Sequence, residues 1–331
     1  GFPPVTGFFP FVYGVILLPH ASPGQTPPGG ARMSGYLYVL AAASLWGLIG
    51  PLSKLSFAAG MDTVEVAFWR TTLAWFFFAG QAVCAREVRI APRDLPAVAG
   101  FGVAGIAGLF GAYVVAVEAG GAALASVLLY TAPAWVALLS WLFLKEPMGG
   151  FKLAAVAATV LGVAGVSLGP GFSGEAAFDG KAIFFGLLSG VTYALYYIFG
   201  KYYLSRYRTP TLFLYALPVG SLTLLPFVHF TRPTLAGAVP CLLLAIFSTY
   251  GAYSIYYAGL RRLEATRAAV VATLEPVIAA VLAYAMFGER FSFAGYLGAG
   301  LIISSVLLTI WDGARERFRA PLPGRSESRA G

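Results

Sequence analysis

Three ionisable residues lie inside long apolar runs of the sequence. Glu275 immediately precedes Pro276 in one run, and Glu65 and Arg70 lie five residues apart in another. Charged groups in such runs are costly to bury and therefore indicate a function. The Glu275 carboxylate could bind a proton or a substrate ammonium group, or it could be hydrogen-bonded to a neighbouring helix in a structural role. Arg70 could bind a substrate carboxylate, or it could form an ion pair or pack between helices.

Aromatic residues repeat at helical spacing in two further apolar runs. Tyr250, Tyr253 and Tyr257 follow the i, i+3, i+7 pattern of one helix face, and Tyr193 and Tyr197 form a similar stripe. A tyrosine hydroxyl among apolar residues needs a hydrogen-bond partner, so it tends to face a cavity or another helix. Two interpretations follow: an aromatic chamber for ring-bearing or cationic ligands, or helix packing and interfacial belts. The candidate binding residues are Trp46, Arg70, Tyr113, Tyr130, Thr131, Tyr193, Tyr197, Tyr250, Tyr253, Tyr257, Thr273 and Glu275.

One stretch of the sequence occurs twice. Residues 122–146 align with residues 265–289 at a shift of 143, so that Pro133 meets Pro276 and Ala132 meets Glu275. A proline in mid-helix removes one backbone hydrogen bond and frees a carbonyl one turn back. Interrupted helices at matching places in two repeats are typical of a transporter's substrate path, and we expect the two prolines to act as gate or hinge residues. The alternative is that both prolines only kink packed helices.

The composition indicates an integral membrane protein. Hydrophobic residues make up 59% of the 331 residues and charged residues only 11%, with a mean hydropathy of +0.78, whereas soluble proteins average about 25% charged residues. The net charge of +8 therefore reflects membrane topology, and we expect no nucleic-acid partner. Two cysteines, two histidines and no phosphate-binding loop of the GxxxxGK type predict no metal, no cofactor, no ATPase and no enzyme activity.

The apolar runs predict an all-α chain that crosses the membrane ten times, with short connections. Residues 1–32 contain only a short apolar run and a Pro/Gly-rich linker, so we expect a disordered leader or appended segment before a natural start at Met33. We divide the remainder into a first half at 33–170, a second half at 171–312 and a tail at 313–331. The predicted helices are 36–57, 62–84, 94–117, 121–144, 150–168, 179–203, 209–230, 236–260, 264–287 and 292–311.

The positions of the basic residues predict the orientation. Most of the 22 lysine and arginine residues fall in connections on one side, if both termini are placed in the cytoplasm. Residues 86–93 and the tail would then be cytoplasmic, and residues 169–179 periplasmic. Each half contains an odd number of helices, so the two halves must enter the membrane in opposite senses. The sequence therefore predicts an inverted repeat.

These features together resemble the EamA family of the drug/metabolite transporter superfamily. The resemblance covers residue 34 to about residue 311 and is carried by WGLIGPLSK, by FWRTTLAW and by the two repeated stretches that contain Pro133 and Pro276. Within that family the chain looks most like the YddG-type bacterial exporters of aromatic amino acids. The resemblance implies a multi-pass protein of the bacterial inner membrane that exports small metabolites, and we expect it to be a monomer.

The expected function is export of aromatic or hydrophobic amino acids by alternating access around a central aromatic-lined cavity. Another small metabolite or a cationic drug is the alternative substrate. A membrane enzyme or a sensor is the alternative outside transport.

Overall fold

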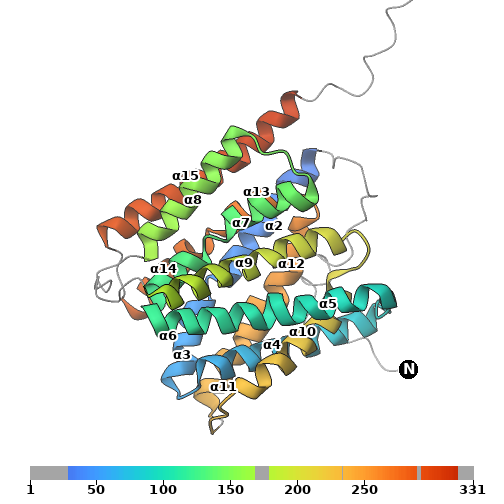
Figure 1. Ribbon diagram of the computed structural model, residues 1–331, viewed down its shortest axis with the longest axis vertical. Helices are drawn as coiled ribbons and strands as arrows, with labels where there is room; N and C mark the ends of the chain where they lie inside the picture. Colours follow the sequence, from blue (N-terminus) through green and yellow to red (C-terminus); the bar gives the residue numbers. More distant parts are fainter. Residues whose placement is uncertain (1–28, 168–178, 233, 289–291, 320–331) are drawn as a thin grey trace, which may run out of the picture.

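The computed structural model describes residues 29–167, 179–232, 234–288 and 292–319, and within these ranges all regular structure is helical (Figure 1). Some helices contain short 3-10 or π-helical turns, labelled η. The elements are α2 (Gly29–Trp46), α3 (Ile49–Ala58), α4 (Thr63–Cys84), η1 (Pro92–Asp94), α5 (Leu95–Phe101), η2 (Gly102–Ala107), α6 (Gly108–Leu129), α7 (Ala132–Leu139), η3 (Ser140–Leu144), α8 (Gly150–Ser167), α9 (Gly180–Tyr203), α10 (Thr209–Leu224), η4 (Leu225–Phe227), α11 (Leu235–Leu243), η5 (Leu244–Gly251), α12 (Ala252–Leu260), α13 (Ala265–Ala272), α14 (Glu275–Phe287) and α15 (Phe293–Arg319).

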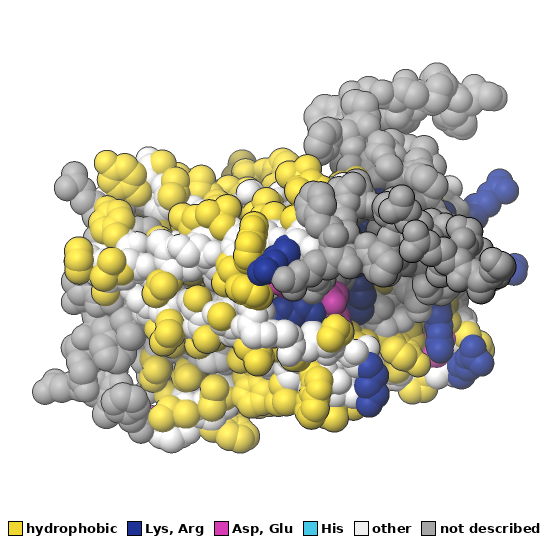
Figure 2. Space-filling model, turned by 90° about the horizontal axis from the view of Figure 1, so that it is seen from above, with side chains coloured by type: hydrophobic (Ala, Val, Ile, Leu, Met, Phe, Trp, Pro, Cys, Tyr) yellow, Lys and Arg dark blue, Asp and Glu magenta, His cyan; other side chains and the backbone are white. Residues whose placement is uncertain are grey.

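Eight stretches among the described residues are long and apolar enough to cross a membrane. The chain is thus a multi-pass membrane protein, and Figure 2 shows hydrophobic side chains over much of one face. Two predicted segments are not among the eight. One is α4, which carries Glu65 and Arg70 in its first half. The other is 121–144, whose first part continues from α6 and whose second part is the shorter apolar helix Ala132–Leu144.

One predicted boundary was confirmed and one was wrong. The predicted separation between the helices 94–117 and 121–144 falls at Gly121, whose non-helical backbone (φ 81°, ψ 160°) kinks the chain within α6. The predicted disordered segment 1–32 was placed too far along the chain, because α2 already begins at Gly29, directly after the last proline of the linker. Residues 1–28, and the boundary between the halves near residue 170, lie outside the described residues.

Helix neighbours come from distant parts of the chain. α4 packs along α10, α2 along α12, α6 along α9, and α8 along α15. The last pair lies especially close, because a Cβ added at Gly298 of α15 would meet the backbone of Gly162 and Gly165 in α8. Small residues of this kind let two helix backbones approach where no hydrophobic effect drives association.

Both repeated stretches form broken helices, as the interpretation of interrupted helices predicts, rather than the continuous kinked helices of the alternative. α6 ends at Leu129 before α7, and α13 ends at Ala272 before α14. Pro133 and Pro276 each occupy the second position of the following helix, where the missing N–H needs no partner. The resemblance extends to the far ends, since Lys145 and Gly288, aligned at the same shift, both end their helices in the left-handed region.

Candidate functional site

A cavity of about 630 Å³ lies where the two broken helices meet α2, α4, α9 and α12. Its volume falls within the range of about 300–1,000 Å³ that is usual for small-molecule sites. The lining is mostly apolar, with a few polar side chains. The lining includes Trp46, Lys54, Arg70, Phe110, Tyr113, Ser126, Tyr130, Tyr193, Tyr253, Glu275, Pro276, Ala283 and Phe287.

Glu275 places a carboxylate in this cavity. It is the first residue of α14, directly after the break, where unpaired backbone N–H groups and the helix dipole favour a negative charge. The Tyr193 hydroxyl donates to its Oε2 at 3.4 Å, and the Tyr130 phenol is a second neighbour. No ion pair is formed by Glu275 within the described part of the chain. The acid is therefore held by neutral groups and remains available to a cationic ligand.

Arg70 brings the opposite charge to the same cavity. Its side chain is only 7% exposed, its Nε donates to Thr249 Oγ1 at 3.2 Å, and its guanidinium lies 5.4 Å from the ring centre of Phe110. The ion pair considered for Arg70 is not formed with any described residue, and Glu65 instead accepts from the Thr231 hydroxyl at 2.8 Å. Arg70 is thus positioned by a hydroxyl and a ring, with no carboxylate to neutralise it.

A π-helical turn accounts for how Thr249 reaches Arg70. Residues Leu244–Gly251 form a π-helix between α11 and α12, and Thr249 Oγ1 also donates to the Leu244 carbonyl five residues earlier. Such turns often lie at functional sites, since the extra residue rotates the side chains that follow it. The turn therefore sets both the position of Arg70 and the face on which Tyr253 lies.

Aromatic rings form one wall of the cavity. Trp46, the last residue of α2, lies 5.4 Å from Tyr253 in an edge-to-face arrangement, and Tyr253 stacks on Tyr196 at 5.3 Å. On the other side, the Tyr113 hydroxyl is hydrogen-bonded to Ser126 at 3.0 Å. These contacts leave ring faces and edges available to a ligand in the cavity that also contains Glu275 and Arg70.

Eight of the predicted residues line the cavity and six do not. Those at the cavity are Trp46, Arg70, Tyr113, Tyr130, Tyr193, Tyr253, Glu275 and Pro276. Those away from it are Thr131, Pro133, Tyr197, Tyr250, Tyr257 and Thr273.

The six have other contacts in the structure. Tyr250 packs against Phe77 and Phe78, and the Tyr257 hydroxyl donates to the Tyr196 carbonyl at 3.2 Å. The Thr131 hydroxyl donates to the Leu128 carbonyl at 2.6 Å, and Thr273 makes the equivalent bond to Val270 at the other break.

Sequence reasoning missed Lys54, Phe110, Ser126, Phe287 and the alanines of α14 as lining residues. Lys54, in the middle of α3, lies over the ring of Phe287, the last residue of α14, at 4.4 Å. Ala279 and Ala283 line the cavity one turn apart. Lys54 could have been predicted because it is a lysine inside an apolar run. The alanines could have been predicted because they form a stripe of small residues beside Glu275.

Comparison with known proteins gives consistent matches along the chain. The model of the EamA-like transporter family matches residues 33–168 and again 180–311. An uncharacterized transporter of Archaeoglobus fulgidus is 29% identical over 79% of this chain and 92% of its own. A protein of Streptantibioticus cattleyicolor named "Probable terminal-alkyne amino-acid exporter" is 30% identical over 70% of this chain and 79% of its own.

One further relative and one solved structure also match this chain. The uncharacterized inner membrane transporter YicL of Salmonella typhimurium is 26% identical over 88% of this chain and 99% of its own. A solved crystal structure that is 17% identical superposes with a TM-score of 0.74, covering 86% of this chain and 99% of the other, and so has the same fold.

Proposed function

The chain belongs to the EamA-like transporter family, and from this premise we propose that it exports aromatic or hydrophobic amino acids through the cavity around Glu275. The single observation that carries the proposal is the pair of opposite charges in one aromatic-lined cavity. Glu275 and Arg70 are each held by neutral groups rather than by a counter-charge. A site built in this way suits a ligand that carries both charges itself.

A zwitterionic α-amino acid has these groups. Its ammonium would bind the Glu275 carboxylate, and its carboxylate would bind the Arg70 guanidinium, which offers several donors in a fixed plane. Its side chain would pack against Trp46 and Tyr253, where ring edges and faces favour another ring. A cationic drug would use Glu275 but leave Arg70 without a partner, which makes that alternative less suitable. Another small zwitterionic metabolite remains the second candidate.

We propose alternating access between two inverted five-helix halves as the mechanism. The matched breaks before Pro133 and Pro276, the matched left-handed ends at Lys145 and Gly288, and the double match to the family model all support two equivalent units. Ten crossings with both termini in the cytoplasm follow from this arrangement and from the basic residues. Rocking of the halves would expose the cavity to each side in turn.

Flux in purified proteoliposomes tests this function. Vesicles loaded with unlabelled phenylalanine should accumulate labelled phenylalanine faster than empty liposomes, and unlabelled tyrosine or tryptophan should compete. Phenethylamine, which lacks the carboxylate, should compete much less well. Protein-dependent flux of an organic cation with no flux of any amino acid would overturn the proposal.

A further inference from the structure

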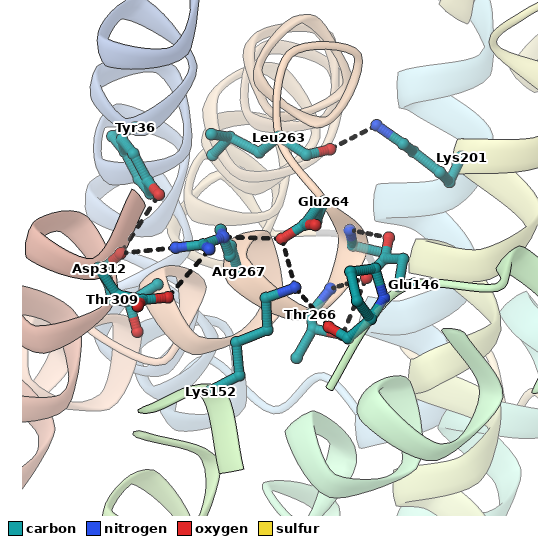
Figure 3. A network of polar contacts seen from close by, with 12 residues as sticks. Tyr36, Glu146, Lys152, Lys201, Leu263, Glu264, Thr266, Arg267, Thr309 and Asp312 are labelled. Atoms are coloured by element: carbon teal, nitrogen blue, oxygen red, sulfur yellow. Dashed lines mark hydrogen bonds and ion pairs between the residues drawn. The ribbon is translucent and has the colours of Figure 1, made fainter. Parts of the chain in front are cut away.

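A network of charged and polar side chains lies at the opposite ends of the helices that line the cavity mouth (Figure 3). In α8, Lys152 of the network is near the first residue, whereas Ser167, the last residue, lines the cavity. Along α13 and α14, Arg267 is near the start and Phe287 of the cavity is at the end. The cavity thus extends to one end of these helices, and the network spans the other end.

The first part of the network caps a helix of one half with a side chain from the other. Glu146 accepts from the backbone N–H of Ala265 at 2.7 Å, from that of Thr266 at 3.2 Å, and from the Thr266 hydroxyl at 3.0 Å. The first N–H groups of α13 have no partner within their own helix, and a carboxylate there also meets the positive end of the helix dipole. Glu146 is only 7% exposed, so this cap is shielded from water.

The second part is a chain of ion pairs between buried cations and partly exposed carboxylates. Lys152 of the first half lies 2.7 Å from Glu264 of the second, and Arg267 bridges Glu264 at 2.7 Å to Asp312 at 2.9 Å. Lys152 and Arg267 are 5% and 4% exposed. Beside them, Tyr36 and Arg267 both donate to the carbonyl of Thr309, at 3.3 Å and 3.1 Å. Lys201 donates to the carbonyls of Leu260 and Leu263, just before Glu264.

We propose that Glu146, Lys152, Glu264 and Thr266 form a latch that holds the halves together on one side of the membrane while the cavity is open toward the other. This inference rests on the transport function proposed above. The contacts that cross between the halves are charge-assisted hydrogen bonds in a site shielded from water, which are stronger than neutral ones. They are also replaceable by water once the halves separate, since every group involved is one that water solvates well. The latch would therefore set the balance between the two states of the transporter.

The rate of thiol labelling at a cavity position measures the ratio of the two states, and the measurement requires no substrate. In a protein with Cys84→Ala and Cys241→Ala, Ala283→Cys places a reporter in the cavity lining. Addition of Glu146→Gln removes the charge that caps α13, and the ratio of the two states should shift about tenfold for a loss of about 1.4 kcal/mol. The rate of labelling from the side opposite the mouth, which reports the less populated state, should rise accordingly, and Glu118→Gln, an exposed glutamate of α6, should leave it unchanged.

A crosslink provides the opposite perturbation. Lys152→Cys with Glu264→Cys, joined by a short bifunctional thiol reagent, should hold the latch closed, keep the reporter fully labelled and stop transport until the link is cleaved.

If Glu146→Gln does not fold, Thr266→Val, which removes only the hydroxyl contact, takes its place. Unchanged labelling in a folded Glu146 or Thr266 variant, or normal transport by the crosslinked protein, would overturn the latch. The labelling experiment does not depend on transport. Absence of amino acid transport would therefore refute the proposed substrate but not the latch.

Discussion

The hydroxyl of Tyr193 in α9 donates to the carboxylate of Glu275 in α14 at 3.4 Å, across the cavity. Glu275 is the residue at which the chain resumes its helix after the break at Thr273 and Leu274. The first N–H groups of α14 have no partner within their own helix, the acid is the first residue of that helix, and the tyrosine hydroxyl contacts the acid. The broken helix and the buried acid therefore stabilise each other. The N-terminus of α14 favours the negative charge of Glu275, and that charge complements the positive end of the helix dipole.

The first prediction follows from this arrangement. Glu275→Gln keeps the size of the side chain and can still accept from Tyr193, but it removes the charge that would bind an ammonium group or a proton. Transport per folded molecule should fall about tenfold or more if about 1.4 kcal/mol of interaction is lost. The melting temperature should change little, since a buried amide is less costly than an unpaired carboxylate. Initial rates and melting curves on one sample decide this, with Glu118→Gln as the matched control.

A second prediction concerns which end of the substrate each charge binds. Arg70→Gln should weaken competition by phenylalanine far more than by phenethylamine, because only phenylalanine has a carboxylate to lose its partner. Glu275→Gln should instead abolish the advantage of phenylalanine over 3-phenylpropionate, which lacks the ammonium group. Arg206→Gln, at an exposed arginine paired with Asp94, serves as the control for a lost positive charge. Equal losses for all three ligands in Arg70→Gln would indicate a structural role for Arg70.

Much of the helical framework can be predicted from the sequence, because a membrane helix must be both apolar and long. The segment predicted at 150–168 is α8 at Gly150–Ser167, and that at 179–203 is α9 at Gly180–Tyr203. The junction predicted between 117 and 121 is found at Gly121, where glycine adopts a backbone conformation that other residues avoid. A proline, in contrast, does not reveal whether its helix bends or breaks.

The site was harder to predict than the framework. Tyr250, Tyr253 and Tyr257 share a face only if the helix is regular, and the π-helical turn at Leu244–Gly251 ends that regularity just before Tyr253. Helices in the middle of a bundle are also surrounded by other helices, so aromatic residues on every side are buried. Tyr253 meets the cavity, while Tyr257 meets Tyr256 and Phe213. Glu275 could be predicted because an isolated charge in an apolar run is costly to bury and usually faces a cavity or the interior of the bundle.

A third prediction tests the close contact between α8 and α15. Gly298→Leu should lower the melting temperature and the yield of folded protein, because the side chain would have to displace the backbone of Gly162 and Gly165. Overpacking of this kind typically costs about 1–3 kcal/mol. Gly300→Leu, two residues along the same helix, has no atom near the added Cβ and should behave like the unmodified protein. Equal stability of the two variants would show that the helices separate easily here.

A fourth prediction concerns orientation. With the native cysteines replaced, Ala58→Cys at the end of α3 should react with a membrane-impermeant thiol reagent added to intact cells, and Arg89→Cys should react only after lysis. Both positions are exposed, so the difference reports the side of the membrane. The expected periplasmic segment 169–179 lies almost entirely outside the described residues, which makes Ala58 the better probe. The reverse pattern of labelling would place both termini outside the cytoplasm.

The last prediction is a loss of latch stability in acid. Burial raises the pKa of the Glu264 carboxyl, but the hydrogen bonds and charges of Lys152 and Arg267 outweigh it, and the net pKa lies below its ordinary value. The other titratable groups of the network are Tyr36, Glu146, Lys201 and Asp312. A lowered pKa in the folded state means that ionised Glu264 stabilises the fold fully above the unfolded pKa of about 4.3. That contribution disappears as the pH falls through the lower, folded value.

The melting temperature should therefore decrease as the pH is lowered below about 4.3. Glu264→Gln should show a lower melting temperature already at neutral pH, and it should respond less than the unmodified protein to further acid, because its side chain does not titrate. Glu118→Gln, which lies outside the latch, should follow the pH dependence of the unmodified protein. A Glu264→Gln variant with the full acid response would assign that response to other carboxylates and remove Glu264 from the latch.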